Sequence, residues 1–196
     1  MPVPDNTLLS EEEQHLLLRI AQESLAEYAQ KNHRINIEDY PLTPRLRRKC
    51  GAFVTLHKNK KLRGCIGYTN SAVPIAQVIS ENAINAGFND SRFSPVQPEE
   101  LADIQIEISA LLPGEKEGSP FIKVNDITEI NIGQDGLYLE HSGVHGAGLL
   151  LPQVPVEQGW DIDAYLKGIC MKAGAPMGAW NEPASKLYRF RAQVFG

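Results

Sequence analysis

The segment from Gly51 to Tyr68 predicts a β-hairpin, and this hairpin limits the fold more than any other part of the sequence. Its first arm reads GAFVTLH, its turn is the polar run KNKK, and its second arm reads LRGCIGY. If the first and last lysines of KNKK close the turn, Cys65 lies opposite Val54. Because side chains alternate along a strand, Cys65 then shares a face with Arg63, and His57 lies on the other face. Both faces carry apolar residues, so we expect the hairpin to be covered on each side.

Most of the remaining chain reads as amphipathic helices and short strands. A capping box of the form S-x-x-E, from Ser10 to Glu13, predicts the start of the first helix. The order of hairpin, helix and terminal glycine in residues 51–87 recurs in residues 136–174, as an internal duplication would produce. The pattern predicts an α+β fold with two similar halves, each formed by a hairpin or sheet and by helices. The expected helices cover residues 10–31, 74–87 and 162–172, and the expected strands cover residues 104–109, 136–140, 149–154 and 187–194.

The chain length of 196 residues fits one domain that contains both halves. We expect an N-terminal helix and entry loop over residues 1–49 and a first α/β half over residues 50–112. The run PGEKEGSP has the composition of a linker, which we extend over residues 113–128. The second α/β half then covers residues 129–196.

Charge and cysteine content exclude several classes of function. A formal net charge of -5 and a pI near 5.6 argue against broad binding to nucleic acid or to an anionic membrane, since both need a basic face. The start of the chain lacks the layout of a signal peptide, and no apolar run approaches the roughly 20 residues of a membrane helix. The three cysteines show no CxxC spacing, which argues against a disulfide framework or a zinc knuckle. We therefore expect a cytoplasmic protein with no metal and no cofactor.

Cys65 is the strongest candidate for a chemical role. Reactivity belongs to the thiolate, and a nearby cation lowers the pKa of a thiol, so Arg63 is the expected partner. Glycine within a strand often marks close approach of another group, so Gly64 and Gly67 would leave room for a substrate or a partner. The alternative is a small buried hydrophobic cysteine whose flanking glycines serve a bulge.

The loop NDSRF contributes a second pair of candidate residues. Asp90 and Arg92 carry opposite charges and lie two positions apart. They could form an ion pair beside the hairpin, or they could bind a charged or polar ligand there. The sequence leaves both alternatives open.

Several blocks of the sequence resemble the AMMECR-type domain family, whose microbial members are called AmmeMemoRadiSam system protein A. The blocks are LRGCIGY, ENAINAGFNDSRFSPV, EISAL, LLPQVPVEQGWD and CMKAGAP, in this order. The resemblance extends from about Cys50 to the end of the chain. It implies an α+β fold with two similar halves, in which residues 62–67 line a cleft between the lobes.

The resemblance also suggests partners. Microbial members are often encoded with a Memo-like protein, whose fold resembles extradiol dioxygenases, and with a radical S-adenosylmethionine protein. The chain lacks the CxxxCxxC motif, so iron–sulfur chemistry would belong to a partner. Some relatives have a histidine in a G-x-H-G segment, and a base borrowed from that position would here be Asp135.

Two hypotheses about function follow. In the first, the chain is an enzyme-like component in which Cys65 is the reactive group, Arg63 lowers its pKa, and Asp90 and Arg92 position a polar substrate. In the second, the chain is a non-catalytic protein-interaction or regulatory module, and Cys65 only packs.

Overall fold

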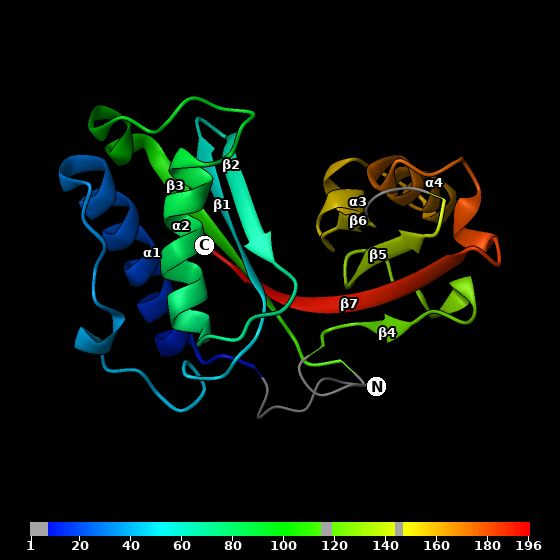
Figure 1. Cartoon of the computed structure of the whole chain (residues 1–196), viewed down its shortest axis with the longest axis horizontal. Helices are drawn as coiled ribbons and strands as arrows, with labels where there is room; N and C mark the ends of the chain where they lie inside the picture. The colour runs from blue at the N-terminus through cyan, green and yellow to red at the C-terminus, as the bar shows by residue number, and fades with distance from the viewer. Residues whose placement is uncertain (1–7, 115–118, 144–146) are drawn as a thin grey trace. The chain divides into compact units, whose positions relative to one another are not determined.

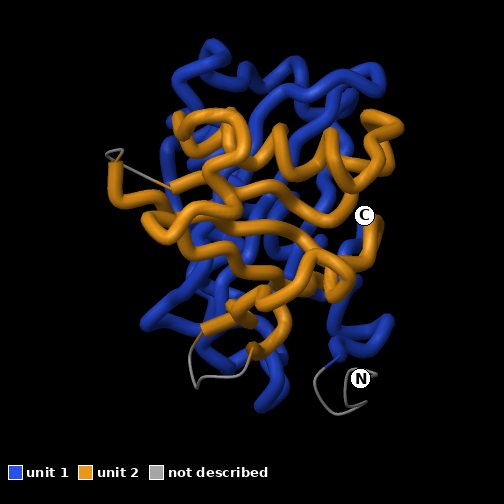
Figure 2. Tube along the Cα trace, turned by 90° about the vertical axis from the view of Figure 1, so that its right-hand side faces the viewer, with its two compact units in different colours: residues 1–111, 193–196 blue, residues 112–192 orange. Residues whose placement is uncertain are grey.

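The computed structural model describes residues 8–114, 119–143 and 147–196, and it has the predicted α+β fold. The chain divides into two compact units (Figure 2). Unit 1 contains residues 1–111 and 193–196, and unit 2 contains residues 112–192. The last four residues thus return to the first unit, whereas the sequence placed them in the second half. The cleft expected between the halves stays a prediction.

Unit 1 is a three-stranded antiparallel sheet with two helices on one face (Figure 1). The strand order is β2-β1-β3, so β2 ends the sheet on one side. Apolar residues of both helices and of alternating strand positions form one core. The strands are β1 (Ala52–Lys58), β2 (Lys61–Tyr68) and β3 (Ile104–Leu111); the helices are α1 (Glu11–Lys31) and α2 (Ile75–Phe88), with short 3₁₀ turns η2 (Ile37–Asp39) and η3 (Pro98–Asp103).

The capping box predicted for α1 is present. The Ser10 side chain accepts from the Glu13 main-chain N–H, and the Glu13 carboxylate accepts from the Ser10 N–H. Glu13 is buried, and its pKa is lowered by hydrogen bonds from Thr43 and Ser10 and by the charge of Arg45, against the effect of burial. One carboxylate therefore caps the helix and ties it to the segment that leads into β1.

The hairpin differs from the predicted register because β2 contains a bulge. Asn59 and Lys60 have positive φ angles of 52° and 62°, as a two-residue type I′ turn requires. His57 pairs with Leu62, as predicted, but the register shifts between Leu56 and His57. Beyond the shift, Cys65 pairs with Thr55 and not with Val54. The prediction therefore placed the Cys65 side chain on the wrong face of the sheet.

The corrected register assigns the two faces of the sheet. Val54 and Leu56 are fully buried against the helices, together with their neighbours on β3. Thr55, His57 and Cys65 lie on the opposite face, because side chains of paired residues share a face. Cys65 and His57, separated in the predicted register, are on the same side.

Gly64 faces α2. A Cβ atom at this position would lie 2.1 Å from the main-chain oxygen of Ala86, in the last turns of that helix. The missing side chain therefore permits close packing of α2 on β2.

Unit 2 repeats the plan of unit 1. Its hairpin is followed by a helix and by a strand that pairs with the first strand of the hairpin, as β3 pairs with β1. Asp161 caps the main helix by accepting from the Ala164 N–H, and Gly174 ends it with a φ of 68°. The strands are β4 (Ile122–Lys123), β5 (Asp135–His141), β6 (Ala147–Leu150) and β7 (Ser185–Phe195); the helices are α3 (Val154–Glu157) and α4 (Ile162–Ala173), with 3₁₀ turns η4 (Ile127–Glu129) and η5 (Ala179–Asn181).

Two details of unit 2 differ from the expectation. The region predicted as a linker, residues 113–128, contains the short strand β4, which pairs with β7; its residues 115–118 lie outside the described part. The strand predicted over residues 149–154 ends at Leu150, because Pro152 follows and α3 then begins at Val154.

We expect Gly64→Ala to lower the free energy of unfolding by about 1–3 kcal/mol, since the methyl group would force α2 away from β2. Urea unfolding followed by circular dichroism measures the change. Leu62→Ala is the matched control on the same strand, because Leu62 is exposed and its truncation should change stability by less than about 0.5 kcal/mol. Equal stabilities of Gly64→Ala and the unmodified protein would contradict the packing assignment.

Candidate functional site

The three cysteines differ in their surroundings. Cys170 is fully buried in unit 2. Burial raises the pKa of the Cys50 thiol to about 11. Cys65 is half-buried, and its sulfur accepts a hydrogen bond from the Thr55 hydroxyl at 3.4 Å. Of the three, Cys65 therefore combines partial exposure with a donor that favours the thiolate.

Asp90 fixes the main chain around Cys65. Its Oδ2 accepts from the Cys65 N–H at 2.9 Å, and its Oδ1 accepts from the Arg92 N–H at 3.2 Å. The Arg92 guanidinium donates to both oxygens, from Nε at 2.9 Å and from Nη2 at 2.7 Å. Hydrogen bonds from Arg92 and from the Cys65 N–H hold the pKa of the Asp90 carboxyl well below its usual range, although the group is buried. The loop after α2 is thereby attached to the edge of β2.

Arg92 is the cation beside Cys65. Its Nη2 lies 3.5 Å from the Cys65 carbonyl oxygen, and its side chain is 52% exposed. The hydrogen bonds to Asp90 are the main cause of its raised pKa, and the negative charge of the Cys65 thiolate adds to that rise. The same attraction favours the thiolate at Cys65. Of the two alternatives for Asp90 and Arg92, the structure shows the first: they form an ion pair next to the hairpin.

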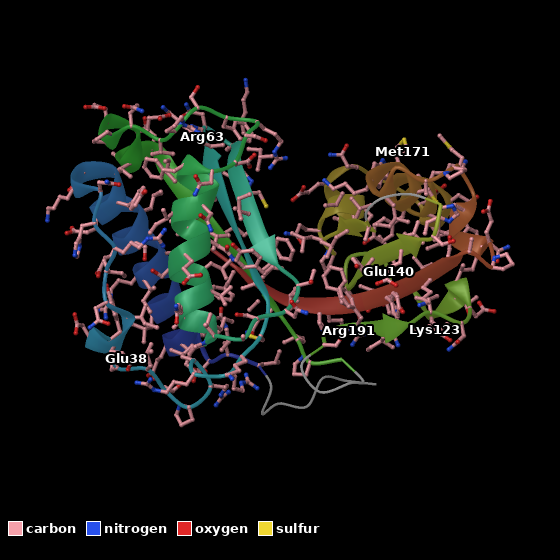
Figure 3. The ribbon with its side chains drawn as sticks, viewed as in Figure 1. Glu38, Arg63, Lys123, Glu140, Met171 and Arg191 are labelled. Carbon is pink, nitrogen blue, oxygen red and sulfur yellow. The ribbon has the colours of Figure 1, made fainter. Side chains whose placement is uncertain are left out.

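Arg63 has a different partner from the one predicted. Its guanidinium donates to the Glu100 carboxylate of η3, from Nε at 3.2 Å and from Nη2 at 3.0 Å, and Lys58 donates to the same carboxylate at 3.0 Å. Arg63, then the Gln97 N–H and Lys58, lower the pKa of Glu100 to about 2. Figure 3 shows Arg63 at the turn end of the hairpin. The Glu100 carboxylate thus balances the Arg63 charge, and Arg92 is a second cation, with an electrostatic interaction with Cys65. A role of Arg63 at Cys65 stays a prediction.

Gly67, the second flanking glycine, also has a packing role. A Cβ atom there would lie 2.2 Å from a ring carbon of Phe53, the residue with which Gly67 pairs. The Phe53 ring therefore covers this glycine, on the face that carries Cys65. A role of Gly64 and Gly67 in binding a substrate or partner stays a prediction.

The sequence did not identify three polar residues on the Cys65 face. Thr55 pairs with Cys65 on one side and with Glu107 of β3 on the other, so these three side chains form a row across the sheet. His57 follows two positions after Thr55 on the same face. A cavity of about 690 Å³ is lined by His57, Gln105 and Glu107, together with residues of α1 and of the chain end. The alternation of side chains along β1 was the only sequence signal that could have grouped these residues. It would have placed them beside Cys65 only with the bulge in β2 taken into account.

Asp135 does not have the environment of a general base. Its carboxylate is fully buried in unit 2 and accepts from Arg191 Nε at 3.0 Å and from both the main-chain and the side-chain N–H of Asn131. Arg189 lies 3.5 Å away. The carboxylate is enclosed by donors, so the role suggested by the G-x-H-G segment is replaced by a structural one.

Other kinds of site have little support. Among the described residues, no group of three or more histidine, cysteine, aspartate or glutamate side chains is placed to hold a metal ion. Within the same part of the chain, no helix is both long enough and apolar enough to cross a bilayer. What the Cys65 site offers chemically is a thiol, a hydroxyl donor and a held guanidinium, the elements of nucleophilic chemistry on a polar molecule.

Comparison with known proteins gives consistent matches over most of the chain. The AMMECR1 family profile matches residues 18–195. A protein of Methanocaldococcus jannaschii is 42% identical over 194 residues, covering 96% of this chain and 92% of the relative, and a protein of Methanothermobacter thermautotrophicus is 40% identical over 191 residues, covering 95% of each. The crystal structure of an uncharacterized protein from Pyrococcus horikoshii matches with a TM-score of 0.85 and 33% identity, covering 95% of this chain and 92% of that one.

We expect Glu100→Gln to lower the free energy of unfolding by roughly 1 kcal/mol at pH 7, because Arg63 and Lys58 lose their carboxylate. The folded-state pKa of Glu100 is depressed, so its contribution is present above the ordinary value of 4.5 and is lost as the pH falls towards about 2. Urea unfolding at several pH values should show the two proteins converging over that window. Glu99→Gln, at an exposed neighbour, is the control, and a constant difference from pH 7 to pH 2 would contradict the assignment.

Proposed function

Because the chain belongs to the AMMECR1 family, we propose that it is an enzyme-like protein whose reactive group is the thiol of Cys65. One observation carries this proposal. Cys65 is half-buried at the edge of a sheet, with a hydroxyl donating to its sulfur and a held guanidinium beside its carbonyl group. Both neighbours favour the charged form of the thiol, which is the nucleophile.

Each residue of the site has a distinct role in the proposal. Thr55 donates to the thiolate and orients it, and Arg92 supplies the positive charge. Asp90 is a positioning residue, since it holds Arg92 and the Cys65 main chain. His57 is the candidate general base, because it lies on the same face, two positions after Thr55, which pairs with Cys65.

The proposal includes the setting in which the protein acts. We propose that the protein acts in the cytoplasm, where the reducing environment keeps thiols free. We propose a Memo-like protein and a radical S-adenosylmethionine protein as its partners. Any redox cofactor would then belong to those partners, and the contribution of this chain would be the thiol.

Alkylation by iodoacetamide, followed by mass spectrometry across a range of pH, tests the central claim. We expect Cys65 to react with an apparent pKa below the ordinary thiol value of about 8.5. Thr55→Val should raise that apparent pKa by roughly 0.5 to 1 unit, because the thiolate loses one hydrogen bond. His57→Gln should slow the labelling of Cys65 at neutral pH, because the candidate base is lost.

Cys50 provides the internal control for this experiment. Its raised pKa predicts slow labelling throughout the neutral range, and Cys50→Ser should leave the Cys65 profile unchanged. An apparent pKa of 8.5 or above for Cys65, or absence of labelling in the folded protein, would show that the thiol is not activated.

A second candidate function, a protein-interaction module, is supported by the exposed edge of unit 1. β2 ends the strand order there, and Leu62 and Tyr68 are 41% and 46% exposed on it. An edge strand with large apolar side chains is a common docking element. In this reading Cys65 has no chemical role.

Binding of the purified Memo-like protein, measured by calorimetry, distinguishes the two candidates. If β2 is a docking element, Tyr68→Ala should weaken binding about tenfold, as expected for an aromatic anchor, while Cys65→Ser leaves it unchanged. Tyr28→Ala is the control, an aromatic truncation on α1. Unchanged binding in Tyr68→Ala would rule out this surface.

A further inference from the structure

From the geometry of Arg92 we infer that the Cys65 site takes a small anionic substrate, whose carboxylate or phosphate group is bound by the Arg92 guanidinium. The inference rests on the proposed function, because it names the class of molecule that meets the reactive thiol. It also reassigns the charged pair of the loop: Arg92 binds the substrate, and Asp90 holds Arg92 in place.

The guanidinium is fixed before any ligand arrives. Nε and Nη2 donate to the two oxygens of Asp90, and the main-chain N–H of Arg92 donates to the same carboxylate. The guanidinium carbon also lies 5.4 Å from the centre of the Phe93 ring. A guanidinium held in this way loses little conformational freedom when it binds an anion, and its planar fork matches the oxygens of carboxylate and phosphate.

The side of the pair that faces outwards is the cation. Each oxygen of Asp90 already accepts two hydrogen bonds, from Arg92 N–H and Nε on Oδ1 and from Cys65 N–H and Arg92 Nη2 on Oδ2. The Asp90 side chain is 5% exposed, whereas that of Arg92 is 52% exposed. Nη1 of Arg92 makes no hydrogen bond to any residue that the structure describes. The outward-facing group is therefore the Arg92 guanidinium, a hydrogen-bond donor that suits an anionic acceptor.

The position of the donor relates it to the thiol. Nη2 lies 3.5 Å from the Cys65 carbonyl oxygen, and the thiolate has an electrostatic effect on Arg92. An anion on Nη1 would therefore lie beside Cys65, at the same edge of β2. Because Asp90 and Arg92 together are neutral, recognition depends on directed N–H donors and on proximity more than on net charge. A small substrate whose reactive carbon is close to its anionic group could contact both Arg92 and the thiol.

Two alkylating agents of nearly equal shape test the inference on the full chain. Iodoacetate and iodoacetamide differ mainly in the charge that Arg92 would bind. For each thiol we take the rate constant with iodoacetate divided by the rate constant with iodoacetamide. We expect this ratio to be at least about tenfold higher at Cys65 than for N-acetylcysteine, a difference that a charge-assisted hydrogen bond can supply. Arg92→Gln should return the ratio close to the reference value.

The control variant removes the same charge from a neighbouring position. Lys61→Gln lies on β2, where Lys61 is exposed, and it should leave the ratio unchanged. Arg92→Lys retains the charge and loses the fork, so we expect most of the preference for iodoacetate to be lost. The ratio in the unmodified protein needs no variant, so the test remains decisive even if Arg92→Gln fails to fold.

The outcomes separate this inference from the proposed function. Rapid reaction with iodoacetamide and a ratio equal to that of N-acetylcysteine would overturn the anionic substrate and leave the activated thiol standing. Failure of Cys65 to react with either reagent would overturn both. Protection against iodoacetamide by inorganic phosphate more than by acetate supports a phosphorylated substrate, and the reverse supports a carboxylate. Absence of protection by both at high concentration would count against the subsite.

Discussion

The Asp90 carboxylate is the interaction on which the rest of the candidate site depends. It is a buried charge, which is tolerated only because four N–H groups donate to its two oxygens. Those donors come from two places, the Cys65 main chain on β2 and the loop residue Arg92. One carboxylate therefore attaches the loop to an edge strand, satisfies the outward N–H of that strand and orients the guanidinium next to the thiol. Without it, Arg92 would keep only the long hydrogen bond from Nη2 to the Cys65 carbonyl oxygen.

The bulge in β2 is the second constraint, because it decides which side chains accompany the thiol. In an unbroken ladder Cys65 would face α2 and the apolar core, and Gly64 would face outwards. Arg63 is the extra residue of β2, opposite the step from Leu56 to His57. It reverses this arrangement, so that Gly64 meets the Ala86 carbonyl and Cys65 meets the Thr55 hydroxyl. A thiol suited only to packing becomes one with polar neighbours through a single local irregularity.

The features of the fold and site that the sequence predicted are those that depend on residues close together in the chain. The capping box of Ser10 and the Gly174 terminus are local, and each was predicted from a few neighbouring residues. The type I′ turn at Asn59 was predicted in position for the same reason. The bulge entered only as the alternative reading of the flanking glycines, because no residue type requires it. The ion pair of Arg63 with Glu100 was not predicted because Glu100 lies far along the chain, where sequence spacing carries no information about contact.

The internal repeat separates what belongs to the fold from what belongs to the site. In β2, Gly64 pairs with the buried Leu56 and faces α2; in β6, Gly148 pairs with the buried Leu139, and a Cβ there would lie 2.6 Å from the main-chain nitrogen of Ala173 on α4. Both hairpins thus use a glycine to admit their helix. The next residue is Cys65 in unit 1 and Leu149 in unit 2, opposite Thr55 and Tyr138 respectively. The glycine is a requirement of the repeated scaffold, whereas the thiol, its hydroxyl donor and its arginine occur together in unit 1, where chemistry is to be sought.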